Sequence, residues 1–254
     1  MRKLVIVLIA AIAILAPMQA AEATTAKFAV TSSASTTSFD LGKSFVLSGT
    51  VSPNAKGKTV KIQRQYVGGA WTTILTKTLS STSKYSATIK PSKAGPTNYR
   101  VLKPSSSARA QGVSPVRAIS IYRWRYLLDL PNTRNPSTVF DGTVLIKGYA
   151  FTKSFSLKQE EYVTWNLNGK GCDKVKTYIG IDDDSVSDTT GKAYILNQSY
   201  DYINYESGLA VGQSARYVQA GLSGSTSITL LPNVVASSSQ AWVAYGSPQV
   251  HCNS

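Results

Sequence analysis

Short runs of alternating apolar and polar residues, separated by Ser, Gly, Pro and Asn, extend through almost the whole chain. Residues 60–66 alternate in this way, and in 162–167 the side chains of Val163, Trp165 and Leu167 fall on one face of an extended strand. A period of two is the pattern of a strand with one buried and one solvated face, and no helical period appears. The sequence therefore predicts an all-β protein made of two β-sandwiches.

The charge of the chain divides it into parts. The 254 residues carry a net charge of +14. Residues 24–125 contain 16 Lys and Arg but only one acid, Asp40, whereas residues 126–254 contain 9 Lys and Arg and 11 Asp and Glu. A charge step this sharp indicates a domain boundary. We expect a signal peptide at 1–23, a strongly basic sandwich at 24–120 and a nearly neutral sandwich at 121–254.

The first residues have the pattern of a secretory signal peptide. Arg2 and Lys3 precede an apolar run at 4–16, which is short for a membrane span, and small residues follow. The small-x-small pattern Ala21-Glu-Ala23 predicts cleavage after Ala23, with Ala20 and Ala26 as alternatives and an uncleaved membrane anchor as the other interpretation. No second apolar stretch reaches spanning length. We expect a secreted, extracellular protein with no transmembrane span after cleavage.

The basic unit contains candidate strands at 45–51, 60–66, 71–77, 85–90 and 99–102, with a Gly68-Gly69 hairpin turn. The segments LSGTVSP at 47–53, VKIQR at 60–64, GAW at 69–71, YSATI at 85–89 and NYRV at 98–101 occur in order along it. With these segments the unit resembles the immunoglobulin-like modules of secreted proteins of Gram-positive actinobacteria. The resemblance implies an immunoglobulin-like sandwich that acts as a spacer or an adhesive unit.

The basic side chains of this unit have two interpretations. They lie largely at polar-facing positions: Lys56, Lys58, Lys61, Arg64, Lys77, Lys84, Lys90 and Lys93. One interpretation is a solvated surface that keeps strand edges unpaired. The other is adhesion to an anionic polymer outside the cell, such as wall teichoic acid, acidic polysaccharide or lipid headgroups. Nucleic acid is not expected as a partner, because the chain is predicted to be secreted and contains no nucleic-acid-binding motif.

The second unit is richer in Tyr, Asp, Asn and Gly, and its Pro131 to Pro136 segment is predicted to be a loop. Eight strand candidates with no helix between them predict a jelly roll. They lie at 143–147, 151–157, 162–167, 174–181, 192–196, 216–221, 227–231 and 241–251.

Several segments of this unit resemble the NPCBM domain, the carbohydrate-binding module attached to some glycoside hydrolases. They are GYAFTKS at 148–154, VTWNLN at 163–168, Cys172, TYIGIDDDS at 177–185, YESG at 205–208 and AWVAYGSPQV at 241–250. The resemblance implies a galactose-binding-like jelly roll that binds glycans without catalysis. The chain departs from the family at 197–202, where the usual Gly-rich turn is missing, and around Trp242, which lacks the flanking His or Asp of family members that bind sugar or calcium.

Sugar recognition requires aromatic faces for the C–H side of the ring and planar polar groups for its hydroxyls. The segment 200–206 supplies both kinds of group, and two later aromatic residues would complete a platform. The alternative is that part of this set packs in the core. The predicted carbohydrate-binding residues are Tyr200, Asp201, Tyr202, Tyr205, Glu206, Trp242 and Tyr245.

The acidic run Asp182, Asp183 and Asp184 has two interpretations. Oxygen ligands in one loop are the ligands that Ca²⁺ prefers. The spacing of an EF-hand fails, however, because Val186 occupies a required oxygen position and no Glu closes the loop. The alternative is a solvated turn in which aspartates accept backbone N–H bonds. No other cofactor is expected.

The two cysteines, Cys172 and Cys252, are predicted to form a disulfide, as expected of a pair in an oxidising compartment. The alternative is a nucleophilic pair of Cys252 with the single histidine, His251, but neighbouring side chains of a strand point to opposite faces. The sequence has no Gly-x-Ser-x-Gly elbow, no His-Glu-x-x-His and no Gly-rich phosphate loop, and its acids suggest no facing catalytic pair. We do not expect an enzyme.

These observations predict a secreted, non-catalytic protein that binds a glycan or cell-wall polysaccharide at or near the bacterial surface. The alternative function is a cell-surface adhesive or structural protein whose C-terminal sandwich binds protein or wall polymer instead of a specific sugar.

Overall fold

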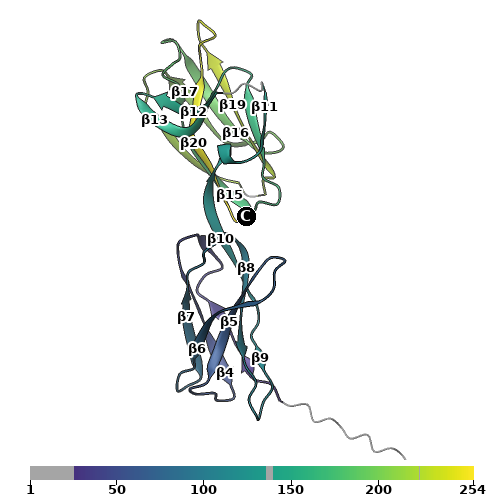
Figure 1. Cartoon of the computed structure of the whole chain (residues 1–254). Helices are drawn as coiled ribbons and strands as arrows, with labels where there is room; N and C mark the ends of the chain where they lie inside the picture. The colour runs from purple at the N-terminus through teal and green to yellow at the C-terminus, as the bar shows by residue number, and fades with distance from the viewer. Residues whose placement is uncertain (1–25, 136–139, 223) are drawn as a thin grey trace, which may run out of the picture.

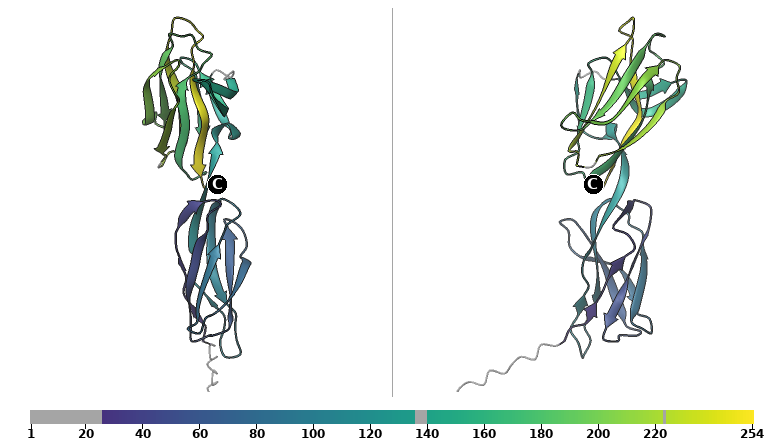
Figure 2. Two further views of the ribbon diagram at one scale, coloured as in Figure 1. Left: turned by 90° about the vertical axis from the view of Figure 1, so that its left-hand side faces the viewer. Right: turned by 180° about the vertical axis from the view of Figure 1, so that it is seen from behind.

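The computed structural model describes residues 26–135, 140–222 and 224–254. The described residues form strands throughout, apart from one 3₁₀ turn at Leu127–Asp129. They make two lobes, each with its own buried core, and strand β10 (Arg117–Tyr126) runs from one lobe into the other (Figure 1, Figure 2). The prediction of an all-β protein with two sandwiches is confirmed.

The N-terminal lobe packs one sheet on another. The first sheet contains β1 (Ala29–Val30), β2 (Ser33–Ala34), β4 (Phe45–Ser52) and β7 (Lys84–Ile89). The second contains β3 (Ser38–Asp40), β5 (Thr59–Tyr66), β6 (Thr72–Thr78), β8 (Gly95–Lys103), β9 (Gly112–Val113) and the first part of β10. Alternate side chains of the two sheets meet in the core, where the ring of Phe45 packs edge-on against Tyr99 with centroids 5.0 Å apart.

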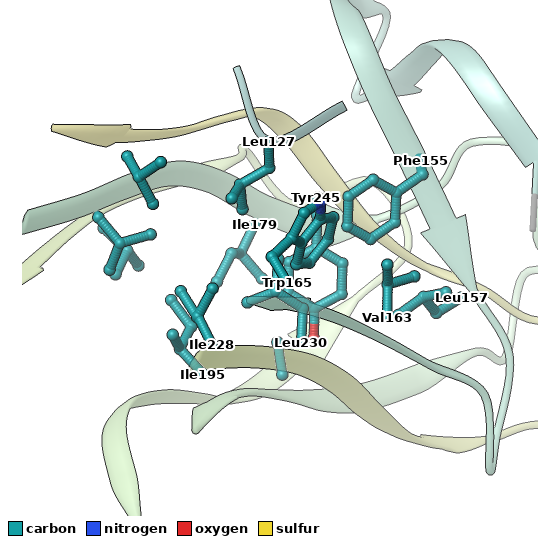
Figure 3. Packing of buried hydrophobic residues seen from close by; sticks show 14 of the residues in the cluster. Leu127, Phe155, Leu157, Val163, Trp165, Ile179, Ile195, Ile228, Leu230 and Tyr245 are labelled. Atoms are coloured by element: carbon teal, nitrogen blue, oxygen red, sulfur yellow. The ribbon is translucent and has the colours of Figure 1, made fainter. Parts of the chain in front are cut away.

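The C-terminal lobe is also a sandwich. One sheet contains β12 (Phe140–Ile146), β13 (Tyr149–Leu157), β15 (Cys172–Ile181), β18 (Arg216–Gly221) and β20 (Val243–Cys252). The other has the order β11 (Asn132–Asn135), β14 (Tyr162–Asn166), β19 (Ser227–Val235), β16 (Thr190–Leu196) and β17 (Tyr202–Ala210). Trp165 lies in the core between them, with its ring centroid 5.7 Å from that of Phe155 (Figure 3). Burial of Val163, Trp165 and Leu167 follows the predicted alternation.

Two segments of this lobe differ from the sequence prediction. The predicted loop at 131–136 contains β11, whose four residues pair with β14 from Asn132↔Trp165 to Asn135↔Tyr162. It is an edge strand, so Pro131 just before it costs few ladder hydrogen bonds. Strand β17 was not among the strand candidates, because its residues 202–208 lack an apolar alternation.

Strand β10 joins the lobes through the backbone. Its first part pairs with β8 and, in parallel, with β3, while its last four residues pair with β20 from Arg123↔Cys252 to Tyr126↔Gln249. The predicted boundary between residues 120 and 121 falls inside this strand. A sheet therefore continues from one lobe into the other, and the C-terminal strand β20 ends beside the junction (Figure 1).

The single histidine lies at this junction. His251 is buried between the rings of Tyr122 and Trp124, whose centroids are 4.8 and 4.9 Å from its own. Its Nδ1 is 2.5 Å from Asp173 Oδ1 of the C-terminal lobe, and its Nε2 is 2.8 Å from Asp40 Oδ1 of the N-terminal lobe. Side-chain contacts thus reinforce the backbone link between the lobes.

Candidate functional site

Three tyrosines lie side by side on the outer face of β16 and β17. The ring of Tyr202 is 5.5 Å from that of Tyr194 and 6.1 Å from that of Tyr205. Tyr202 is 68% exposed and Tyr205 is 57% exposed. Residues 202 and 205 would point to opposite faces of a regular strand. The pairing register shifts between Ile195 and Leu196, which brings both rings to the face of Tyr194. We call Tyr194, Tyr202 and Tyr205 the tyrosine platform.

The other predicted residues of 200–206 have local partners. Tyr200 is exposed in a turn with a φ of 63°. Asp201 belongs to the same turn: its backbone N–H donates to Asn197 Oδ1, and its Oδ2 accepts a bond from Asn197 Nδ2 at 3.3 Å. These contacts fix the turn that precedes β17.

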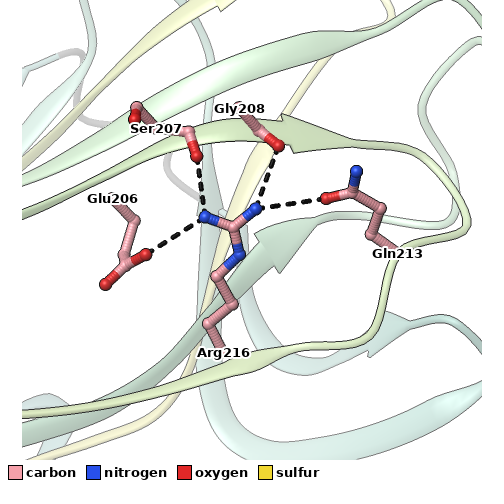
Figure 4. Close-up of polar contacts among 5 residues, drawn as sticks. All are labelled: Glu206, Ser207, Gly208, Gln213 and Arg216. Carbon is pink, nitrogen blue, oxygen red and sulfur yellow. Dashed lines mark hydrogen bonds and ion pairs between the residues drawn. The ribbon is translucent and has the colours of Figure 1, made fainter.

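Glu206 is held by Arg216 of β18. Arg216 Nη1 is 3.2 Å from Glu206 Oε2 and 2.7 Å from the carbonyl oxygen of Ser207 (Figure 4). Its Nη2 donates to the carbonyl oxygen of Gly208 at 3.0 Å and to Gln213 Oε1 at 3.3 Å. The guanidinium therefore ties the edge strand β17 to β18, which gives Glu206 a structural partner beside the tyrosine platform.

Tyr245 was wrongly predicted as a sugar contact. Its side chain is 0% exposed, and its ring lies against Phe155 in the core with centroids 5.4 Å apart (Figure 3). Its hydroxyl donates to the carbonyl oxygen of Leu231 at 2.7 Å. Burial raises the pKa of this hydroxyl well above its usual value.

Trp242 lies at a different place from the tyrosines. It lines a pocket of about 230 Å³ together with Thr143, Leu145, Ser156, Asp182 and Asp184. Strands β15 and β20 pair antiparallel with Ile181 opposite Val243. Asp182, which follows Ile181, therefore lies opposite Trp242, which precedes Val243. The backbone N–H of Asp182 accordingly donates to the carbonyl oxygen of Trp242 at 3.1 Å. We call this the Trp242 pocket.

The two carboxylates of the Trp242 pocket differ in environment. Asp182 is buried; it accepts a hydrogen bond from Ser156 Oγ at Oδ2 and another from the backbone N–H of Asp184 at Oδ1, 3.2 Å away. Burial raises the pKa of the Asp182 carboxyl above its ordinary 3.8, against the opposing effect of the Ser156 hydrogen bond. Asp184 is exposed at the mouth of the pocket. A buried acceptor and an exposed acceptor thus lie in one pocket with an indole ring.

The third aspartate of the run has a structural role. Asp183 accepts backbone hydrogen bonds from Lys147 at 2.7 Å and from Gly148 at 2.6 Å. Both donors have positive φ, 53° and 75°, in the tight turn between β12 and β13. Asp183 therefore fixes the hairpin that contributes Leu145 to the Trp242 pocket, in agreement with the predicted turn-capping role of this run. In the described ranges, no three His, Cys, Asp or Glu side chains gather as a metal site would require.

Cys172 and Cys252 form the predicted disulfide. No free cysteine occurs among the residues that the structure describes. The alternative pairing of Cys252 with His251 as a nucleophile is therefore wrong, and the imidazole contacts two carboxylates at the lobe junction instead.

The signal peptide prediction, 1–23, lies outside the described residues. Within the part of the chain that is described, no helix is both long and apolar enough to cross a membrane.

Solved structures of carbohydrate-binding modules resemble this chain. The CBM51-2 and INT domains of Clostridium perfringens ZmpB are 16% identical, with a TM-score of 0.41 over 63% of this chain and 38% of theirs. The CBM51 module of Clostridium perfringens GH95, solved in complex with methyl-galactose, is 12% identical with a TM-score of 0.41 over 50% of this chain and 99% of the module. Tandem CBM51 modules of a Streptococcus pneumoniae family 98 glycoside hydrolase are 13% identical, with a TM-score of 0.41 over 81% of this chain and 80% of theirs.

The chain thus spans 38% of the length of the ZmpB structure. No protein-family model matches the sequence, and a comparison with curated proteins finds no match.

Proposed function

We propose that this is a secreted, non-catalytic carbohydrate-binding protein that acts at or near the bacterial cell surface, with the Trp242 pocket as its sugar site. The observation that carries the proposal is the meeting of an indole ring with two carboxylates, Asp182 and Asp184, in one concave pocket. An aromatic face covers the C–H side of a sugar ring, and carboxylate oxygens accept bonds from its hydroxyls. Thr143 adds a hydroxyl group to the lining of the pocket, and the Ser156 hydroxyl, also in the lining, donates to Asp182.

The size of the pocket favours a small ligand. Its volume of about 230 Å³ lies below the roughly 300–1,000 Å³ typical of pockets for drug-sized ligands. A single sugar unit, such as the end of a glycan chain, suits this space better than a run of several units. Lys158 is not a lining residue of this pocket; its Nζ lies over the indole ring, 5.0 Å from the Trp242 centroid, and this cation–π contact helps to hold the ring in place.

The tyrosine platform is proposed as a second, separate contact surface. The rings of Tyr202 and Tyr205 are exposed on the outer face of the sheet beside the half-buried Tyr194, and exposed aromatic rings are suited to stacking on sugar units. It lines no wall of the Trp242 pocket. Contacts on the platform would therefore add affinity for a longer or branched glycan without setting which sugar enters the pocket.

The carboxylates of the pocket favour binding over hydrolysis. Glycoside hydrolysis uses two carboxyl groups on opposite sides of the scissile bond. Asp182 and Asp184 lie two residues apart on one loop, and the backbone of Asp184 donates to Asp182. They suit recognition of the hydroxyls on one side of a sugar.

A glycan array with the intact protein tests the proposal. We expect binding that Trp242→Ala and Asp184→Asn each reduce at least tenfold, because one removes the stacking face and the other an acceptor. The matched control Tyr217→Ala removes an exposed ring of β18, outside the pocket, and is expected to leave binding within twofold. The double variant Tyr202→Ala/Tyr205→Ala should weaken longer glycans more than monosaccharides.

Absence of binding to any glycan at high protein concentration would contradict the proposal and favour the adhesive alternative. Loss of monosaccharide binding in the platform variant alone would move the site from Trp242 to the tyrosines.

A further inference from the structure

A second pocket lies in the N-terminal lobe, at the end away from the lobe junction. It has a volume of about 690 Å³ and lies between the turn after β4 and the loop after β8. Strand β8 begins near the junction, where Gly95 pairs with Ile121, and ends at this pocket with Lys103. Three lysines and three serines line it: Lys56, Lys58, Lys103, Ser105, Ser106 and Ser107. We call it the lysine pocket.

Lys103 is unusual among these lysines because it is 4% exposed. Its Nζ donates to the carbonyl oxygen of Pro104 at 3.1 Å and lies 4.7 Å from the ring centroid of Phe28. An ammonium group has three donors, and the Pro104 bond uses one of them. Burial, and then the charge of Lys58, lower the pKa of Lys103. A buried cation that borders a pocket with spare donors and a like charge nearby is stabilised by an anion placed there.

No carboxylate of the lobe supplies that anion. Among the described residues, no Lys or Arg of this lobe forms an ion pair with an acid. The one acid of 24–125, Asp40, contacts His251 at the junction. The lysine pocket therefore has three positive side chains and no negative side chain among its lining residues.

Both walls of the pocket are fixed by hydrogen bonds. On one wall, Asn54 Oδ1 accepts from the backbone N–H of Lys56 at 2.9 Å and from Ser83 Oγ at 2.7 Å, and the carbonyl oxygen of Lys58 accepts from the N–H of Leu79 at 2.8 Å. On the other, the N–H of Ser106 donates to the carbonyl oxygen of Arg109 at 2.8 Å. The lysines are thus carried by ordered backbone, which reduces the entropy lost when a ligand binds.

We propose that the lysine pocket binds phosphate groups of a phosphodiester-linked polymer. Lys56, Lys58 and Lys103 pair with phosphate oxygens, and the hydroxyls at 105–107 donate further hydrogen bonds. Lysine is a common phosphate ligand that acts as a point charge, whereas planar carboxylates are matched best by the fork of an arginine, which this pocket lacks. The volume exceeds that of a single phosphate ion and leaves room for the units that link successive phosphates.

The site is independent of the proposed sugar site, since it lies in the other lobe and shares no residue with the Trp242 pocket. Failure of one proposal therefore leaves the other standing. The sequence predicts that the basic lobe as a whole adheres to an anionic wall polymer. The present proposal places that binding at the lysine pocket and names phosphate as the anion.

Calorimetric titration of the intact protein with inorganic phosphate and with poly(glycerol phosphate) tests the proposal at low salt. We expect both probes to bind, the polymer more tightly, with affinity falling at least tenfold between 20 mM and 150 mM salt because the contacts are ionic. Lys58→Gln and Lys103→Met should each weaken polymer binding at least tenfold. Methionine retains the apolar stem of the buried Lys103, and Lys58 is exposed, so its replacement tests the site without disturbing the core.

The matched control is Lys90→Gln, which removes an equal charge beyond the opposite end of β7, where Ile89 pairs with Phe45. It should leave binding within twofold, as should Trp242→Ala. Equal losses in Lys90→Gln and Lys58→Gln would overturn the pocket in favour of diffuse charge. Binding of polygalacturonate as tight as that of the phosphate polymer would overturn the assignment to phosphate, and no binding of either phosphate probe would overturn the site.

Discussion

Removal of the Cys172–Cys252 disulfide is expected to destabilise the C-terminal lobe by about 4–5 kcal/mol. The bond closes a loop with a sequence separation of 80 residues, and the chain-entropy relation gives roughly 4.5 kcal/mol for a loop of that size at 25 °C. The cysteines are also register partners in β15 and β20. The cross-link therefore holds strands already in native pairing, and its contribution comes from restricting the unfolded chain.

The perturbation is best made in two ways. Reduction of the intact protein keeps the sulfur atoms and removes the cross-link alone. The variant Cys172→Ala/Cys252→Ala also removes a sulfur at a fully buried position of the core, which adds about 1 kcal/mol for lost packing. We therefore expect the alanine variant to be less stable than the reduced protein by this smaller amount.

Urea unfolding followed by hydrogen exchange of individual peptides is the appropriate assay. Both cysteines lie in the C-terminal lobe, so peptides of β5 and β8 in the N-terminal lobe serve as an internal control. We expect the loss of protection in β16 and β18, with little change in β5. A loss below about 1 kcal/mol in the C-terminal lobe would refute the loop-entropy argument, and an equal loss in both lobes would refute its localisation.

Three further predictions concern single residues. Tyr245→Phe removes the hydroxyl that donates to the carbonyl oxygen of Leu231. We therefore expect the free energy of unfolding, measured with denaturant, to fall by about 1–2 kcal/mol, while glycan affinity stays unchanged. A reduced glycan affinity would instead make Tyr245 a ligand contact. Glycan affinity should fall as pH is lowered through the pKa of Asp182, because the ionised carboxylate is the acceptor. Since burial raises that pKa above 3.8, the fall begins at a higher pH than for an ordinary aspartate; affinity measured by titration in Asp182→Asn should be low and lack this dependence. Asp40→Ala removes the contact of the N-terminal lobe to His251. Small-angle scattering should then show a broader range of shapes, with each lobe's stability changed by less than about 1 kcal/mol, and an unchanged profile would contradict the role of this contact.

The strands of both lobes were predictable where apolar residues alternate. Segment 60–66 corresponds to β5 (Thr59–Tyr66), and 216–221 has the bounds of β18. Strand β17 was not predictable in this way, because Ile203 and Leu209, its two apolar contacts with the core, are separated by Asn, Tyr, Glu, Ser and Gly and by shifts in the pairing register. Pairing with β16, a contact across the sheet, decides its conformation.

The candidate site shows a similar limit. The sequence identified Trp242 as a binding residue and the 182–184 run as an acidic feature, but assigned them to different ligands. They meet because β15 and β20 pair antiparallel with Ile181 opposite Val243. That register joins positions about sixty residues apart, and no local pattern specifies it. The tyrosines at 202 and 205, three positions apart in the sequence, could be grouped correctly, whereas Trp242 and Tyr245 could not be separated into pocket and core.

The junction gives the uneven charge of the chain a structural basis. The N-terminal lobe carries 16 Lys and Arg in 24–125, yet the single acid of this segment, Asp40, contacts His251 of the other lobe. Asp173 holds the opposite edge of the same imidazole. The one carboxylate of the basic lobe is thus committed to joining the lobes, which leaves the lysine pocket at the far end without a competing internal anion. An acid near the pocket would form salt bridges with its lysines and neutralise their charge. Because 24–125 contain no acid other than Asp40, the lysines keep their charge for an external anion.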